Sequence, residues 1–301
     1  MDAVLQWGVD LILAIQAERT PALDAFFRNI TRLGGGFHLF IVPFVVWSLS
    51  YRLGSRLLVT LLLSVFSNFA LKDLFAQPRP FQLEPRIGPD REIGYGIPSG
   101  HAQHTMVEWG IIAAWIARPW FWIFAVVLVV LIGFSRVYLG VHFPSDVLAG
   151  WALAALILLL HLRFAERVAA RLAAMGIGCQ IAVAAGVSGS FVLAYALFLE
   201  DRYIVGAAGI LFGAGVGIAL CRRYLRAPEA GALWQRALRY FVGMGVLLVY
   251  LNQSGRLIPP QQDLVYFVVI YVLNAGGGLW VTAGAPALFQ ALRLTPAGGR
   301  D

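Results

Sequence analysis

Residues 120–138 read WFWIFAVVLVVLIGFSRVY, an apolar run in which the first charged side chain is Arg136. A helix needs about 20 residues of this kind to cross the hydrocarbon core of a bilayer. The rest of the chain is similar, since 59% of its 301 residues are hydrophobic, 13% are charged and the mean hydropathy is +0.75. This composition excludes a soluble globule with a polar surface. We therefore predict an all-α fold, a polytopic bundle of transmembrane helices.

The apolar segments predict about nine transmembrane helices, of which the eighth is short and the ninth is long for the roughly 20 residues that a span needs. Two shorter helices, residues 3–16 and 21–33, are expected to lie in the membrane interface, because each is too short or too charged to span. A basic amphipathic stretch, residues 163–171, follows the fifth span, and three glycines at 276–278 interrupt the ninth. The expected spans are residues 36–50, 57–75, 103–117, 120–138, 145–162, 177–199, 204–220, 240–251 and 264–288.

The distribution of basic residues indicates which helix ends face the cytoplasm, because Lys and Arg favour cytoplasmic loops. When the loops are assigned alternately to two sides, the first side receives Arg52, Arg56, Arg118, Arg163, Arg167, Arg171, Arg222, Arg223, Arg226, Arg236, Arg239, Arg293 and Arg300. The second side receives only Arg202 and Arg256 outside the N-terminal region and the motif loops. We assign the first side to the cytoplasm, and attribute Arg19, Arg28 and Arg32 to an interfacial segment.

The net charge of +7 is explained by this topology. The basic residues form short clusters between apolar runs and no basic domain, so we expect no nucleic-acid partner. The two cysteines, Cys179 and Cys221, lie far apart without the spacing of a zinc site.

Three short stretches gather ionisable side chains at the ends of apolar segments. They read KDLFAQPRP at 72–80, PSGH at 98–101 and SRVYLGVHFPSD at 135–146. Ionisable groups beside or within a membrane are costly and usually functional. The alternating assignment places all three stretches on the non-cytoplasmic side. We therefore predict a phosphate site that faces the periplasm or another external compartment.

The third stretch contains His142 and Asp146, four residues apart with Pro144 between them. Proline is favoured in the first turn of a helix, so Asp146 is expected in the first turn of the fifth span, within reach of the imidazole just outside it. A carboxylate that holds one ring nitrogen fixes the tautomer and leaves the other nitrogen free to attack. We predict that His142 is a nucleophile.

The other two stretches supply a proton donor and phosphate ligands. Ser99 and Gly100 are expected to offer hydroxyl and backbone donors at the start of the third span, a favourable position for an anion. His101 follows them and is suited to protonate a leaving alkoxide and then to activate water. The cations expected to bind the phosphoryl oxygens are Lys72, Arg79 and Arg136. No metal and no other cofactor is needed in this scheme.

These residues, in this order and spacing, resemble the type 2 phosphatidic acid phosphatase superfamily of membrane lipid phosphatases. Its pattern is a lysine followed after six residues by Arg-Pro, then PSGH, then Ser-Arg followed after five residues by His and after three more by Asp. The resemblance implies a phosphohistidine on His142 oriented by Asp146, with His101 as proton donor. It implies a phosphate held by Lys72, Arg79, Ser99, Gly100 and Arg136.

The resemblance covers residues 20–165 and implies a lipid phosphate or pyrophosphate substrate, in an integral protein of a bacterial inner membrane. We expect interfacial helices at 1–35, a catalytic core of five to six helices within 36–165, and additional transmembrane helices of open role at 166–301. Two alternatives stay open. The chain is a lipid phosphotransferase, or it is a lipid transporter or scaffold built on the phosphatase core. Neither the lipid nor the oligomeric state follows from the residues.

Several polar residues also have an ordinary structural interpretation. Any one of the three cations alone would be interpreted as a side chain that reaches from a helix end to the membrane surface. His104 and Glu108 share a face of the third span with His101, where a polar contact with a neighbouring helix is the simplest expectation. Asn274 with the three glycines is expected to mark close helix packing.

Overall fold

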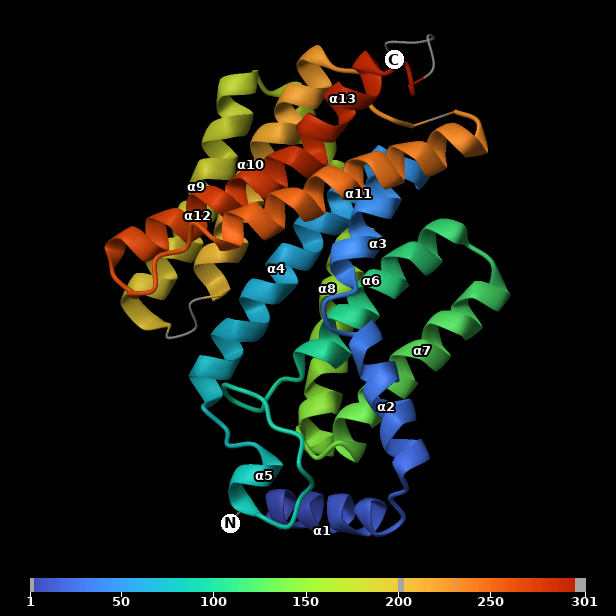
Figure 1. Cartoon of the computed structure of the whole chain (residues 1–301), viewed down its shortest axis with the longest axis vertical. Helices are drawn as coiled ribbons and strands as arrows, with labels where there is room; N and C mark the ends of the chain where they lie inside the picture. The colour runs from blue at the N-terminus through green and yellow to red at the C-terminus, as the bar shows by residue number, and fades with distance from the viewer. Residues whose placement is uncertain (1–2, 200–202, 230, 296–301) are drawn as a thin grey trace. The chain divides into compact units, whose positions relative to one another are not determined.

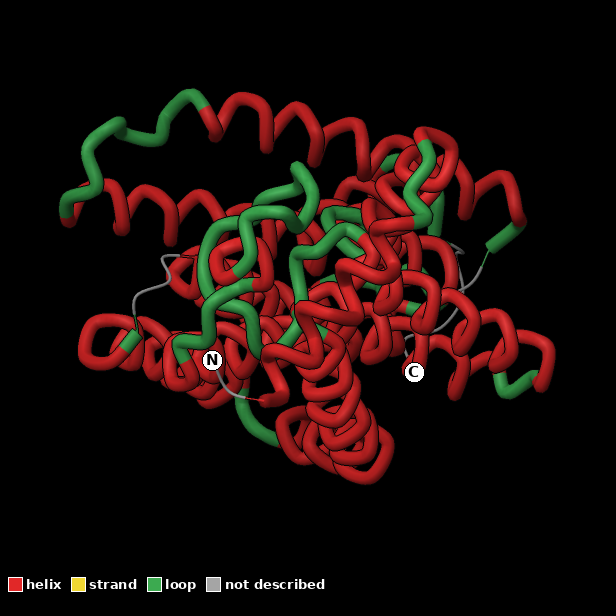
Figure 2. The backbone as a smooth tube through the Cα atoms, turned by 90° about the horizontal axis from the view of Figure 1, so that it is seen from below, coloured by secondary structure: helices red, strands yellow, loops and turns green. Residues whose placement is uncertain are grey.

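Helix is the only regular secondary structure in the part of the chain that the computed structural model describes, residues 3–199, 203–229 and 231–295 (Figures 1 and 2). The predicted all-α fold is therefore confirmed. Arg202 and Arg300, which entered the count of basic residues above, lie outside the described residues. The helices are α1 (Ala3–Ala17), α2 (Pro21–Leu33), α3 (His38–Phe44), η1 (Val45–Leu49), α4 (Tyr51–Phe75), α5 (Pro80–Leu83), α6 (Gly100–Ile116), α7 (Pro119–Tyr138), α8 (Pro144–Ala174), α9 (Ile177–Phe198), α10 (Tyr203–Tyr224), α11 (Leu233–Gly255), α12 (Leu264–Leu279), η2 (Trp280–Gly284) and α13 (Ala285–Ala291).

Six helical segments of the described residues are long and apolar enough to cross a membrane, or seven if the pair Pro21–Leu33 and His38–Leu49 is one broken span. The expected count of about nine is therefore not confirmed. Two of the expected spans fall short for different reasons. Helix α6 has only 17 residues. Helix α11 has 23 residues, but Arg236, Arg239 and Asn252 lie toward its ends and reduce its apolar length.

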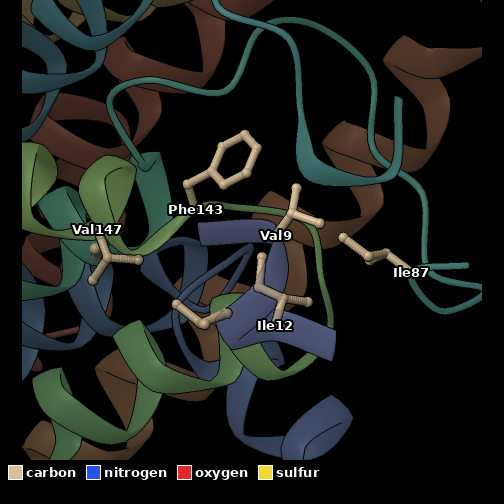
Figure 3. Close-up of a cluster of buried hydrophobic side chains, with 7 residues drawn as sticks. Val9, Ile12, Ile87, Phe143 and Val147 are labelled. Atoms are coloured by element: carbon tan, nitrogen blue, oxygen red, sulfur yellow. The ribbon is translucent and has the colours of Figure 1, made fainter. Parts of the chain in front are cut away.

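The helices group into two units, which are described separately: Met1–His38 with Leu63–Arg163, and Leu39–Leu62 with Phe164–Asp301. In the first unit, α7 packs against α1, α2 and α6, and α1 also contacts α5. An apolar cluster joins α1 to the segments around it, with Val9, Ile12, Ile87, Phe143 and Val147 among its buried side chains (Figure 3). Helix α1 is thus part of the core of this unit.

In the second unit, α10 packs against α9, α12 and η2. Glycines allow the close approach of α10 and α12, because a Cβ at Gly213 would lie 1.8 Å from the carbonyl oxygen of Ala275. Small residues are the usual means by which membrane helices approach closely. The expected interruption at residues 276–278 was wrong, since α12 continues through these glycines and the irregular π-helical turn begins at Trp280.

Helix α8 begins with Pro144 and has Asp146 in its first turn, as the sequence predicts. It continues without a break to Ala174. The basic stretch 163–171 therefore lies within this helix, as a continuation of the fifth span.

Candidate active site

The three motif stretches meet in the first unit. The first covers the end of α4 and the start of α5, the second leads into α6, and the third joins α7 to α8. The backbone N–H of Ser99 donates to the carbonyl oxygen of Asp146 at 2.9 Å, and this bond connects the start of α6 to the start of α8. Gly150 permits the approach, because a Cβ there would lie 2.7 Å from the carbonyl oxygen of Ser99.

His142 and Asp146 form a buried pair. The Nδ1 atom of His142 lies 3.2 Å from Oδ2 of Asp146, and the carboxyl group is completely buried. The same oxygen accepts from the backbone N–H of Phe143 at 2.9 Å, and Oδ1 accepts from Nε2 of Gln77 at 2.7 Å. Three donors therefore fix the carboxylate, and the carboxylate fixes the ring.

The position of His142 keeps its ring uncharged. The residue lies in the short connection between α7 and α8, outside both helices, and is buried. Burial lowers the pKa of the imidazole well below its ordinary value of 6.5, and the cations Arg79, Lys72 and Arg136 lower it further. A neutral imidazole at pH 7 keeps a lone pair on one ring nitrogen, which a nucleophile requires.

Arg79 is the cation that contacts His142. Its Nη1 atom lies 3.3 Å from Nε2 of His142, the ring nitrogen opposite the one that faces Asp146. The same Nη1 donates to the carbonyl oxygen of Val141 at 2.8 Å. A phosphoryl group attacked by Nε2 would therefore lie against this guanidinium group.

Arg136 and Lys72 complete the cationic group. Arg136 donates through Nη1 to Oγ1 of Thr31 at 2.6 Å and through Nη2 to the carboxylate of Glu92. Lys72 donates to the carbonyl oxygens of Tyr95 and of Gly96, the latter at 3.1 Å. All three cations are nearly buried, so their charges are poorly screened by solvent.

The second stretch lies beside this group. The side-chain oxygen of Ser99 is buried and has no hydrogen-bond partner among the described residues, so the hydroxyl is available to a ligand although its backbone N–H is not. Gly100 begins α6, and a Cβ there would lie 3.2 Å from Oδ1 of Asn68. His101 makes no hydrogen bond to His142 in the part of the chain described, and the turn at Gly35 covers its ring, where a Cβ would lie 3.1 Å from Nε2.

A buried amide network fastens α6 to α4. Asn68 donates to the carbonyl oxygen of Pro98 at 3.2 Å and to Gln103 at 2.7 Å, and Gln103 donates to the carbonyl oxygen of Ser64 at 2.9 Å. Within the described residues, no three His, Cys, Asp or Glu side chains are grouped as possible metal ligands.

Sequence reasoning missed three residues at the site. Gln77 stood inside the first motif, where a polar residue between Lys72 and Arg79 was a possible signal. The sequence carried no such signal for Glu92, which lies in a loop, or for Thr31, which lies in a helix expected at the membrane interface. The expected polar contact of α6 is present for Glu108, which pairs with Nδ1 of His38 at 2.5 Å.

Comparison with known proteins gives two family matches. The PAP2 superfamily matches residues 53–170, and the family described as "PAP2 superfamily phosphatase, transmembrane extension" matches residues 205–298. An undecaprenyl-diphosphatase of Sulfolobus acidocaldarius is 32% identical over 157 residues, which cover 49% of this chain and 73% of that protein. A phosphatidylglycerophosphatase B of Bacillus subtilis is 30% identical over 164 residues, covering 50% of this chain and 79% of that protein.

One solved structure with similarity is the transmembrane PAP2-type phosphatidylglycerolphosphate phosphatase of Bacillus subtilis. It shares 27% sequence identity with this chain, covers 56% of this chain and 88% of its own, and superposes with a TM-score of 0.49.

Proposed function

This chain belongs to the PAP2 superfamily and is a membrane-integral phosphatase, and from that premise we propose that it hydrolyses a lipid phosphate or pyrophosphate through a phosphohistidine on His142. The observation that carries the proposal is the placement of His142 between two charged groups. Its Nδ1 faces the carboxylate of Asp146 and its Nε2 faces the guanidinium group of Arg79. One ring nitrogen is thus oriented, and the other points to where a phosphoryl group would be bound.

The reaction has two steps. In the first, Nε2 of His142 attacks phosphorus, the bond from phosphorus to the leaving oxygen breaks, and His101 gives that oxygen a proton. In the second, His101 takes a proton from water as the water oxygen attacks phosphorus, and the bond to Nε2 breaks. Inorganic phosphate leaves and His142 is restored.

The phosphate ligands act on the charge that the phosphoryl oxygens carry. Lys72, Arg79 and Arg136 stabilise this charge in the transition state, and the hydroxyl of Ser99 and the backbone N–H of Gly100 add uncharged donors. Three nearly buried cations are a strong field for a dianion, because the surrounding protein screens them weakly. The scheme needs no metal ion.

We propose a lipid as the substrate because the relatives named above act on undecaprenyl diphosphate and phosphatidylglycerophosphate by their names, and because apolar side chains lie exposed beside the site. Phe75 at the end of α4 is 57% exposed, and Ile93 in the following loop is 93% exposed. An acyl or prenyl chain attached to the phosphate could cover both.

We propose that the site faces the periplasm or the exterior, in a bacterial inner membrane, because the basic residues gather at the opposite helix ends. In this scheme residues 36–165 are the catalytic core, residues 1–35 lie at the interface and residues 166–301 add further helices. The test is an Ile93→Cys variant in a background without Cys179 and Cys221. A membrane-impermeant maleimide should label it in intact cells, and labelling only after lysis would reverse the orientation.

The function is tested by phosphate release from a panel of purified lipid phosphates and pyrophosphates, with and without EDTA. Wild type should be active in both conditions, and His142→Ala should be inactive although it is folded. Acid quenching during turnover of a radiolabelled substrate should trap an acid-labile phosphoenzyme on the wild type alone. Dependence on a divalent metal, or full turnover by His142→Ala, would exclude the mechanism. Transfer of the label to an added alcohol in preference to water would indicate a phosphotransferase.

A further inference from the structure

Glu92 is a carboxylate at the proposed phosphate site that belongs to none of the three motifs. Its Oε2 accepts from Nη1 of Arg79 at 3.1 Å, and its Oε1 accepts from Nη2 of Arg136. A carboxylate and a phosphoryl group offer similar oxygen acceptors to a guanidinium group. Glu92 therefore engages, on both arginines, N–H groups that the proposed function assigns to the phosphate.

Glu92 opens a short segment that lies across all three cations, and we call residues 92–96 the strap. The carbonyl oxygens of Ile93 and Gly94 accept from Arg79 at 3.1 and 2.8 Å, and those of Tyr95 and Gly96 accept from Lys72. These carbonyls are neutral. Glu92 is the one member of the strap whose charge matches the kind of ligand that the cations would bind.

The charges of the site favour exchange of Glu92 for a phosphate. Glu92 and a bound phosphate would both carry negative charge and would both lie against Arg79 and Arg136. Their mutual repulsion is weakly screened in a poorly solvated site, and it is relieved when the Glu92 carboxylate turns away.

Glu92 is placed so that it can turn away while the arginines stay. Its side chain is 31% exposed, and the side chains of Arg79 and Arg136 are 4% and 2% exposed. Arg79 keeps its bond to the carbonyl oxygen of Val141, and Arg136 keeps its bond to Thr31. Within the strap, Gly94 has a φ of +79°, and no heavy atom lies within 4 Å of where its Cβ would be.

We propose that Glu92 is a displaceable counter-ion, which gives up the two arginines to the substrate phosphate and returns to them as inorganic phosphate leaves. This inference rests on the proposed function and deepens it. Because Glu92 is tethered to the chain, its effective concentration at the arginines is high, so it competes with every phosphate ligand. The product is thereby held less tightly than three buried cations would otherwise hold it. Glu92 thus acts on the substrate only through the two arginines.

Competition makes a specific thermodynamic demand. A tethered competitor reduces the affinity of every ligand for the same site by one common factor. A residue that only held the arginines in place would instead increase the affinity of these ligands. The test therefore compares inorganic phosphate with sulfate, a tetrahedral dianion that cannot be a product. Both are titrated by calorimetry into the full chain in detergent, and inorganic phosphate is also assayed as an inhibitor of lipid phosphate hydrolysis.

We expect Glu92→Gln to bind both anions about tenfold to a hundredfold more tightly than wild type, by the same factor, which is the range for loss of a charge-assisted hydrogen bond. Glu92→Asp keeps the charge on a shorter side chain and should bind them with intermediate affinity. The matched control is Glu84→Gln, since Glu84 pairs with Arg86 at 2.9 Å and has no bond to the three cations. This control should bind both anions as wild type does.

Unchanged or weaker anion binding in Glu92→Gln would overturn the inference, as would tightening of phosphate without sulfate. If Glu92→Gln does not fold, Glu92→Asp decides by the same comparison. Calorimetry measures anion binding without turnover, so the proposed function and the counter-ion role of Glu92 are tested independently. A wild type that hydrolyses no lipid phosphate refutes the proposed function, whereas an active wild type with unaltered anion affinity in Glu92→Gln refutes the counter-ion.

Discussion

Around His142 the helices are joined by buried hydrogen bonds and ion pairs, whereas α10 and α12 are joined by glycine contacts. Asp146, with no exposed surface, is fixed by Phe143 and Gln77. At the α10 and α12 contact, a Cβ at Gly213 would lie 1.8 Å from backbone. In the first region a lost hydrogen bond should change chemistry, and in the second an added methyl group should change stability.

The same comparison bears on the alternative of a transporter. A pathway through the C-terminal helices would be lined by polar side chains. Asn274 was the main polar candidate there, and its amide donates to the carbonyl oxygen of Ile270 in its own helix at 2.8 Å. This hydrogen bond stays within α12, which favours a packing role for Asn274 itself.

The largest effect is expected from Asp146→Asn. The substitution keeps the shape of the side chain and removes the charge that orients His142, so kcat should fall by about 10³- to 10⁴-fold, as in other carboxylate and histidine pairs. The measurement is phosphate release at saturating substrate, with thermal unfolding as the check on folding. Asp10→Asn, the same change at an exposed position of α1, should leave kcat unaltered. A loss of less than tenfold at Asp146 would contradict the orienting role.

The next effect is expected from Gly213→Ala, because the new methyl group would meet backbone atoms of α12 that cannot rotate away. We expect a loss of about 1–3 kcal/mol in the free energy of unfolding, the usual range for overpacking, with kcat unchanged in the folded protein. Differential scanning fluorimetry in detergent measures the accompanying fall in melting temperature. The control is Gly186→Ala in α9, where no heavy atom lies within 4 Å of the Cβ position. Equal stability of the two variants would refute close packing.

The smallest effect concerns pH. Because burial and the nearby cations lower the pKa of His142, the neutral ring persists below pH 6.5, and the acid limb of kcat/KM should lie below that value. Activity should hold as the pH falls to 6.5 and decline only at lower pH, when the ring gains its proton. The measurement is the pH profile of kcat/KM. It is corrected for the ionisation of the substrate phosphate, which is measured separately by phosphorus NMR. An acid limb above 6.5 would contradict the lowered pKa.

The parts that the sequence predicted depend on local geometry. Pro144 and Asp146 fall within one helical turn, so the spacing alone places the carboxylate beside His142. The long apolar run at 120–138 likewise matches α7, which covers Pro119–Tyr138. Short-range periodicity and capping act within a few residues of sequence, and therefore can be recognised without the fold.

The parts that the sequence could not predict depend on contacts between distant residues. Arg136 bonds to Thr31, which is 105 positions away, and Glu92 reaches both arginines from a loop without periodicity. No pattern of apolar residues specifies such contacts. The number of spans was not confirmed for a different reason, because α6 has only 17 residues and polar residues shorten the apolar part of α11.

Helix α1 determines how much of this chain an experimenter must keep. The side chain of Phe143, next to His142, is buried against α1, and a Cβ at Gly8 would lie 2.7 Å from its ring. Thr31, which holds Arg136, also precedes the family match at 53–170. An expression fragment of residues 53–170 would contain all three motifs. It would lack α1, which packs against Phe143, and Thr31, which binds Arg136. The smallest active protein is therefore expected to begin at or before α1.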